Sequence, residues 1–226
     1  MKKLLTLFLI FFSLNAFAQD NIEEVYFQNG QKPKLYLKCG NDFQFLLSPN
    51  MNPDNLEYKI EGGKLILGKS YEKITIVPTS AKVTLSIFYE RELIKKQTFS
   101  VQLIPLPTVR VRYFHKTLKK FPQKIILDVI PESNFKDQLP ADTRYKVSRF
   151  TVQLVRNREV IVKDIFTEEI TPADEAIRSY IKMIKAEPNE NWRLVVEVKG
   201  VQRMNFQNQI ENVSMPATIF SLPFKL

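Results

Sequence analysis

Short runs of alternating apolar and polar residues, separated by turn-forming residues, are the feature that most restricts how this chain can fold. Each run aligns its apolar side chains on one face, and this period of two is typical of strands buried on one side. Several such runs with Pro, Gly and Asn between them predict an antiparallel β-sandwich. The runs in the first half are PKLYLK (33–38), DFQFLL (42–47), LEYKI (56–60), KLIL (64–67), YEKITIV (71–77), AKVTLSIFY (81–89) and TFSVQLI (98–104).

A pair of prolines interrupts this alternation. Pro105 and Pro107 follow the last run of the first half, and a new alternating run begins at Val109. Proline lacks a backbone N–H and fixes its own φ, so it does not continue a sheet ladder. The step indicates a short, stiff connection between an Ig-like β-sandwich domain over 19–106 and a second β-sandwich domain over 107–226. A kinked edge strand within one sheet is the alternative interpretation.

The second half continues mainly as strands. The polar segments 131–144 and 204–213 are expected to be loops, and residues 156–159 are expected to form a hairpin turn. The run 145–155 changes its apolar face near Ser148, which predicts a β-bulge. Strands are expected at 109–114, 124–130, 145–155, 160–166, 193–202 and 217–224.

One segment of the second half has the period of a helix. Thr171 is suited to the N-cap, Pro172 to the first helical position, and Asp174 completes a capping box. Pro188 ends the pattern. The fold class predicted from the whole sequence is therefore mainly β, with two tandem Ig-like β-sandwich domains, the second carrying one α-helix at about 172–185. The apolar positions of this helix are Ile177, Tyr180, Ile181 and Ile184.

The first 18 residues have the pattern of a secretory signal peptide. Lys2 and Lys3 precede an apolar stretch, and small residues precede a cleavage site after Ala18. No Cys follows this site, so a lipid anchor is not expected there. We expect a periplasmic or secreted protein with no transmembrane segment after cleavage. An uncleaved N-terminal anchor is the alternative.

The charge of the chain is strongly basic. The formal net charge is +9, and cleavage after Ala18 removes two lysines and no acid, which leaves +7. Acidic proteins, anionic sugars or membrane headgroups are the expected counterparts of an exported basic protein, rather than nucleic acid. Cys39 is the only cysteine, so no internal disulfide forms. It is expected to be a small buried side chain, and intermolecular pairing is the alternative.

The sequence offers little for catalysis. His115 is the only histidine and lies among cationic residues. One His and one Cys give no spacing typical of a zinc site, and no Gly-x-Gly loop is present to bind phosphate. No pair of carboxylates is singled out for acid–base chemistry. We expect no enzyme activity, no cofactor and no metal site.

One basic segment is a candidate binding surface. RVRYFHKTLKKFPQK (110–124) interleaves cationic and aromatic residues and is predicted to bind an acidic partner. The alternative is a solvated strand and loop whose aromatic side chains pack inward. The cationic residues of this patch are Arg110, Arg112, Lys116, Lys119, Lys120 and Lys124.

The order of several segments resembles the GldM/PorM family. LYLKCGNDFQF, NLEYKIEGGKLI, ITIVPT and TFSVQLIPLP are similar, in that order, to the third periplasmic domain of that family. YKVSRFTVQLV (145–155), the helix at 172–185 and ATIFSL (217–222) resemble its last domain. The family comprises inner-membrane subunits of the type IX secretion and gliding motor of Bacteroidota.

This resemblance implies a role without catalysis. It implies tandem Ig-like domains that bind periplasmic or outer-membrane-associated proteins, and it implies a homodimer. The chain is short and has a signal peptide where the family has a membrane helix and coiled domains, so energy coupling is not carried over. We expect a non-enzymatic interaction module, a component, accessory part or paralogue of a secretion or gliding-motility complex.

A module that binds carbohydrate or another cell-surface ligand is the alternative function. It requires an exposed aromatic platform, for which Trp192 and Tyr113 are the candidates. Trp192 as a core residue at the end of the helix is the competing interpretation.

Overall fold

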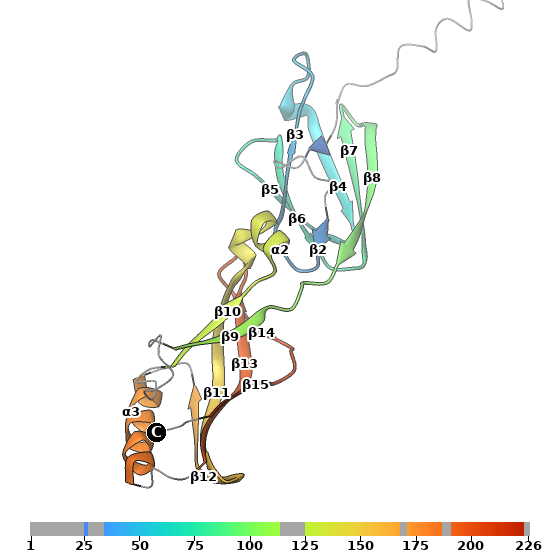
Figure 1. The fold of residues 1–226 in the computed structure, drawn as a ribbon. Helices are drawn as coiled ribbons and strands as arrows, with labels where there is room; N and C mark the ends of the chain where they lie inside the picture. Colours follow the sequence, from blue (N-terminus) through green and yellow to red (C-terminus); the bar gives the residue numbers. More distant parts are fainter. Residues whose placement is uncertain (1–24, 27–33, 114–124, 168–170, 187–190, 224–226) are drawn as a thin grey trace, which may run out of the picture. The chain divides into compact units, whose positions relative to one another are not determined.

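The computed structural model describes residues 25–26, 34–113, 125–167, 171–186 and 191–223 (Figure 1). Strands make up most of these residues, which confirms the mainly β, sandwich-like fold class. Contacts between Cα atoms divide the chain into two units, 1–103 and 104–226. Each unit has its own cluster of buried apolar side chains.

Unit 1 contains two four-stranded sheets. The first has the order β1-β3-β6-β5 and the second has the order β2-β8-β7-β4. β2 runs parallel to β8, and the other described pairs are antiparallel. The strands are β1 (Val25–Tyr26), β2 (Leu35–Tyr36), β3 (Asn41–Phe45), β4 (Leu56–Glu61), β5 (Gly63–Leu67), β6 (Lys73–Pro78), β7 (Lys82–Tyr89) and β8 (Glu92–Gln102), with a 3-10 turn, η1 (Pro53–Asn55), before β4.

The core of unit 1 follows the predicted alternation. The apolar faces that the sequence predicts for β3, β6 and β7 are the buried ones, because every second side chain of a strand points to the same side. Cys39 is fully buried, which confirms its interpretation as a small buried side chain. The buried side chains from these strands are Phe43, Phe45, Ile74, Ile76, Val83, Leu85 and Ile87.

Two turns of unit 1 need special backbone angles. Gly62 has φ +81°, and a Cβ there would lie 2.2 Å from the carbonyl oxygen of Lys82, so only glycine fits. Glu90 and Arg91 both have positive φ and form the tight turn between β7 and β8. Two left-handed residues match the twist of a two-residue hairpin.

Unit 2 contains a two-stranded ribbon and a five-stranded sheet. The ribbon pairs β9 (Thr108–Tyr113) with β10 (Ile125–Ile130). The sheet has the order β12-β11-β13, and the far edge of β13 is shared by β14 and β15. Its strands are β11 (Arg144–Arg156), β12 (Glu159–Thr167), β13 (Trp192–Met204), β14 (Ile210–Val213) and β15 (Thr218–Pro223), and the helical elements are α2 (Ser133–Gln138), η2 (Pro140–Asp142) and α3 (Thr171–Ala186).

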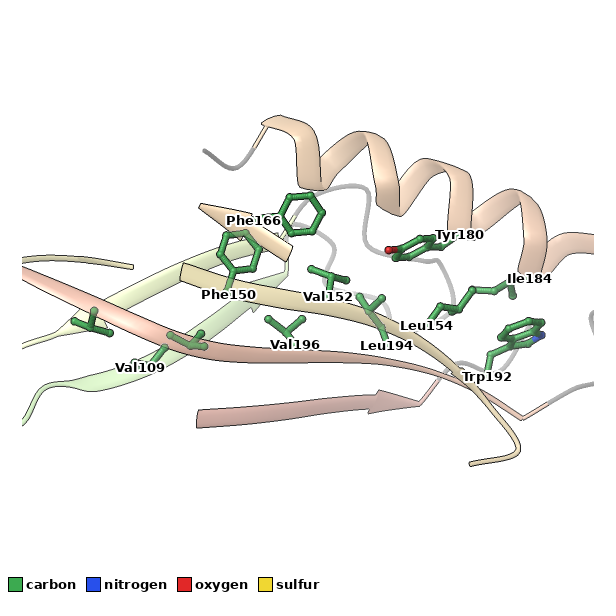
Figure 2. Close-up of a cluster of buried hydrophobic side chains, with 12 residues drawn as sticks. Val109, Phe150, Val152, Leu154, Phe166, Tyr180, Ile184, Trp192, Leu194 and Val196 are labelled. Atoms are coloured by element: carbon green, nitrogen blue, oxygen red, sulfur yellow. The ribbon is translucent and has the colours of Figure 1, made fainter. Parts of the chain in front are cut away.

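One face of the five-stranded sheet carries the core of unit 2. Figure 2 shows α3 lying along this face, with Tyr180 and Ile184 directed at the sheet. The Tyr180 hydroxyl donates to Asp164 of β12, which fixes the helix to the edge strand. The sheet contributes Phe150, Val152 and Leu154 from β11, Phe166 from β12, and Trp192, Leu194, Val196 and Val198 from β13.

A β-bulge extends this buried face along the whole sheet. The register of β11 against β13 shifts between Val147 and Phe150, opposite Gly200, which confirms the predicted bulge near Ser148. Val198 and Val201 are both buried although they are three residues apart, because the bulge inserts one extra residue. The ribbon packs on the same cluster through Val109.

Two segments expected to be loops contain regular structure. Residues 131–144 include α2, which forms because the carboxylate of Glu132 accepts hydrogen bonds from the N–H groups of Asn134 and Phe135. The Phe135 side chain is fully buried. Residues 204–213 include β14, which pairs with the end of β13. The helix expected at about 172–185 is confirmed as α3. The side chain of Thr171, its predicted N-cap, and Pro188, its predicted end, lie outside the described part of the chain.

A buried polar cluster joins η2 to the β13–β14 connection. Arg203 is 2% exposed, and its guanidinium donates to Asp142 Oδ1 at 3.1 Å and to Glu211 Oε2 at 2.6 Å. Asn205 donates to Glu211 Oε1 at 3.0 Å and accepts from the N–H groups of Gln207 and Gln209. A buried charge is costly unless it is paired in this way.

Replacement of Arg203 by Met is expected to lower the free energy of unfolding by about 3–5 kcal/mol, because Asp142 would stay buried without its counter-ion. Urea unfolding measures this change. The matched control is Arg178→Met, since Arg178 and Glu175 form an exposed pair at 3.9 Å; its expected effect is within about 0.5 kcal/mol. Equal effects of the two substitutions would contradict the role given to the buried cluster.

Tyr58 links the two sheets of unit 1. Its ring stacks on Phe45 with the centroids 5.6 Å apart, and its hydroxyl donates to the carbonyl oxygen of Tyr71. Burial, with a smaller contribution from the charge of Glu72, raises the pKa of Tyr58 to about 12. Between pH 10 and about pH 12, the native state therefore keeps the phenol proton of Tyr58, whereas the unfolded chain releases it.

The stability of unit 1 is expected to fall as the pH rises from about 10 to about 12. The contribution from Tyr58 is complete below the pKa of an unfolded tyrosine and is lost as the pH passes the raised native value. The free energy of unfolding of Tyr58→Phe should depend less steeply on pH in this range. Urea titrations of both proteins from pH 9 upwards measure the slopes, and identical slopes would count against this assignment.

Candidate interaction site

The predicted basic patch begins on β9. Arg110 and Arg112 are two residues apart on this strand and therefore point to the same side of the ribbon, and both are exposed. Arg112 forms an ion pair with Asp128 of β10, and its Nη2 donates to Asp128 Oδ1 at 2.8 Å. This hydrogen bond and the charge of Asp128 raise the pKa of Arg112. The other four residues of the patch, Lys116, Lys119, Lys120 and Lys124, lie outside the described residues.

The aromatic platform expected of a carbohydrate-binding module is not formed by Trp192. This side chain is 3% exposed and belongs to the core under α3. It is the first residue of β13 and shares the inward face with Leu194, so the alternation of the strand buries it. The guanidinium of Arg156 lies 5.3 Å from its ring. The side chain of Tyr113 and residue His115 lie outside the described part of the chain.

A groove of about 480 Å³ lies beside the ribbon. Four consecutive residues of β10, 127–130, and three consecutive residues of β11, 145–147, line it. Neighbouring side chains of a strand point to opposite faces, so a cavity that touches consecutive residues runs along the edge of the strand. The groove therefore lies between an edge of β10 and an edge of β11.

Both of these edges lack a strand partner among the described residues. β10 pairs with β9 on one side, and no described strand pairs with its other side. β11 pairs with β13 from Arg144 onward, whereas its pairing with β12 begins only at Arg149. The groove contains residues of β10 and none of β9, so it lies at the outer edge of the ribbon.

The walls of the groove are apolar and its rim is basic. Phe150, Val147 and Val129 contribute to the walls, and Lys136 of α2 and Lys146 of β11 lie at the exposed rim. Asp128 also lines the groove, and its carboxylate forms an ion pair with Arg112.

The net charge of the chain is concentrated in the same unit. Residues 104–226 contain 20 Lys and Arg against 14 Asp and Glu, a net charge of +6. Residues 19–103 contain 11 against 10, a net charge of +1. An anionic partner is therefore attracted mainly to the second unit.

The sequence does not predict the groove. Lys136 belongs to the segment expected to be a loop, and a strand edge without a partner has no pattern of its own in the sequence. The Pro131-Glu132 step before Phe135 is the signal that could have indicated α2, since Glu132 caps it.

Within the described ranges, no group of three or more His, Cys, Asp or Glu side chains is close enough to hold a metal ion. The buried carboxylate of Asp142 is engaged by Arg203. No helix in the described part of the chain is long and apolar enough to cross a membrane.

Comparison with known protein families gives a match for the second unit. The profile of the GldM C-terminal domain matches residues 105–223. This range spans more than half of the chain and corresponds to unit 2. None of the curated proteins matches the chain.

Proposed function

The chain belongs to the GldM C-terminal domain family, and on that premise we propose that it is a non-enzymatic, exported protein-interaction module. Its role is that of a periplasmic component, accessory part or paralogue of a type IX secretion or gliding-motility complex in Bacteroidota. The observation that carries this proposal is the family match over 105–223. That range includes the ribbon, the five-stranded sheet and α3.

The location and assembly belong to the same proposal. Residues 1–18 direct export and are removed after Ala18, which leaves the protein periplasmic or secreted. Its partners are periplasmic or outer-membrane-associated proteins, and membership of the family favours a homodimer.

The basic patch is the contact surface that we propose for an acidic partner. Arg110 is exposed on β9, and Arg112 is exposed although Asp128 engages it. The net charge of +6 over residues 104–226 supports the same assignment, because complementary charge speeds the encounter of two proteins and selects between partners. Lys116, Lys119, Lys120 and Lys124 extend the patch along the sequence.

A cross-linked pulldown of the tagged mature protein from the periplasm and outer membrane of its native host, read by mass spectrometry, tests the function. Secretion or gliding subunits are expected among the recovered proteins. Their absence, with cross-linking verified on a known periplasmic complex, would contradict the proposed function.

A fourfold charge reversal tests the patch. Arg110, Arg112, Lys119 and Lys120 are changed to Glu, and the recovery of those subunits is expected to fall at least about tenfold, since several attractive charges become repulsive. The matched control reverses Arg158, Lys163, Lys182 and Lys185, which are exposed elsewhere in unit 2. If the patch variant recovers the same amount of these subunits as the wild type, the patch is not the contact surface. That result does not contradict the proposed function.

A further inference from the structure

We propose that the groove between β10 and β11 binds an extended acidic peptide segment of a partner protein, which adds as a strand to the outer edge of β10. This inference deepens the proposed function and rests on it, because it gives the binding module a specific site and a mode of recognition. The groove adjoins the basic patch on β9, because Arg112 of the patch forms an ion pair with Asp128 of the groove.

The outer edge of β10 is available for pairing with a third strand. An antiparallel strand directs the N–H and C=O groups of alternate residues to each of its edges, and no described strand pairs with the outer edge of β10. An isolated two-stranded ribbon is marginally stable, and a third strand would add to the stability that this ribbon gains by packing on the core of unit 2. An added strand would therefore satisfy backbone groups of β10 and complete the ribbon.

The groove has the shape that such a strand requires. It follows 127–130 along β10 and 145–147 along β11, so it provides a path along two backbones rather than a closed pocket. Four residues of strand span about 13 Å. The start of β11 provides the opposite wall, at the point where β12 no longer covers its edge.

The lining of the groove defines the chemistry of the peptide. Val129, Val147 and Phe150 favour apolar side chains at every second position of the bound strand. Lys136 and Lys146 at the rim favour acidic side chains at the positions between. Arg112 engages Asp128, which removes most of the repulsion that this carboxylate would exert. The expected motif alternates Val or Ile with Glu or Asp.

The probe that tests this proposal is a fluorescein-labelled eight-residue peptide in which Glu alternates with Val or Ile. Fluorescence anisotropy measures its binding to the complete mature protein. Saturable binding is expected, with at least about tenfold weaker binding of two matched peptides. One carries Lys in place of Glu and tests charge; the other is N-methylated at alternate residues, which removes backbone donors and tests strand pairing.

Protein variants locate the site. Ile130→Arg removes an apolar side chain that lines the groove and is 36% exposed, and it is expected to weaken binding about tenfold. The double variant Lys136→Glu with Lys146→Glu is expected to weaken binding of the Glu peptide and to improve binding of the Lys peptide. The control is Lys163→Glu with Lys182→Glu, which carries the same change in charge away from the groove and should bind like the wild type. Thermal unfolding verifies that each variant is folded.

Hydrogen exchange identifies the edge that the peptide occupies. The amides of alternate residues within 127–130, which point to the outer edge of β10, are expected to become protected when the Glu peptide binds. Protection confined to another strand edge, equal binding of the N-methylated peptide, or no saturable binding up to about 1 mM would each overturn the proposal. These outcomes concern the groove alone, whereas a wild-type pulldown without secretion or gliding subunits counts against the proposed function.

Discussion

The antiparallel pairing of β11 with β13 is the interaction on which the second unit depends. The two strands pair from Arg144 to Arg156 and include the bulge opposite Gly200. Every other strand of the five-stranded sheet is joined to one of them. The bulge keeps a single face buried along the whole ladder, and both α3 and the β9–β10 ribbon pack on one cluster of apolar side chains on this face. A ladder without the bulge would turn Val201 and Arg203 to the opposite face.

Hydrogen bonds of buried polar side chains determine which connecting segments pack against which strands. In unit 1 the Asn41 side chain donates to the carbonyl oxygens of Tyr36, Cys39 and Ile76 and accepts from the N–H of Tyr36. It therefore holds the β2–β3 connection against β6. In unit 2 the Arg203 cluster holds η2 against the end of β13 in a comparable way. Apolar contacts are non-directional, whereas hydrogen bonds specify which segments meet.

The open edges of β10 and β11 are the feature on which the proposed recognition of a peptide segment depends. Natural sheets cover, shorten or charge their edges, because an unpaired edge pairs readily with another chain. In unit 2 the uncovered parts of β10 and β11 face the same groove, with lysines at its rim. In the proposed mode of binding, this placement favours a partner of complementary charge.

The sequence by itself determined which side chains of β3, β6 and β7 are buried, where α3 lies, and that β11 carries a bulge near Ser148. These features depend on period, steric preference and turn chemistry within a few residues. Only the tertiary structure decided that Trp192 is buried, that Glu132 caps a helix within a polar segment, and that residues 210–213 form a strand. Only the tertiary structure decided the groove as well. The edges of β10 and β11 stay open because of pairings between segments that are far apart in the chain. Local periodicity does not encode such pairings.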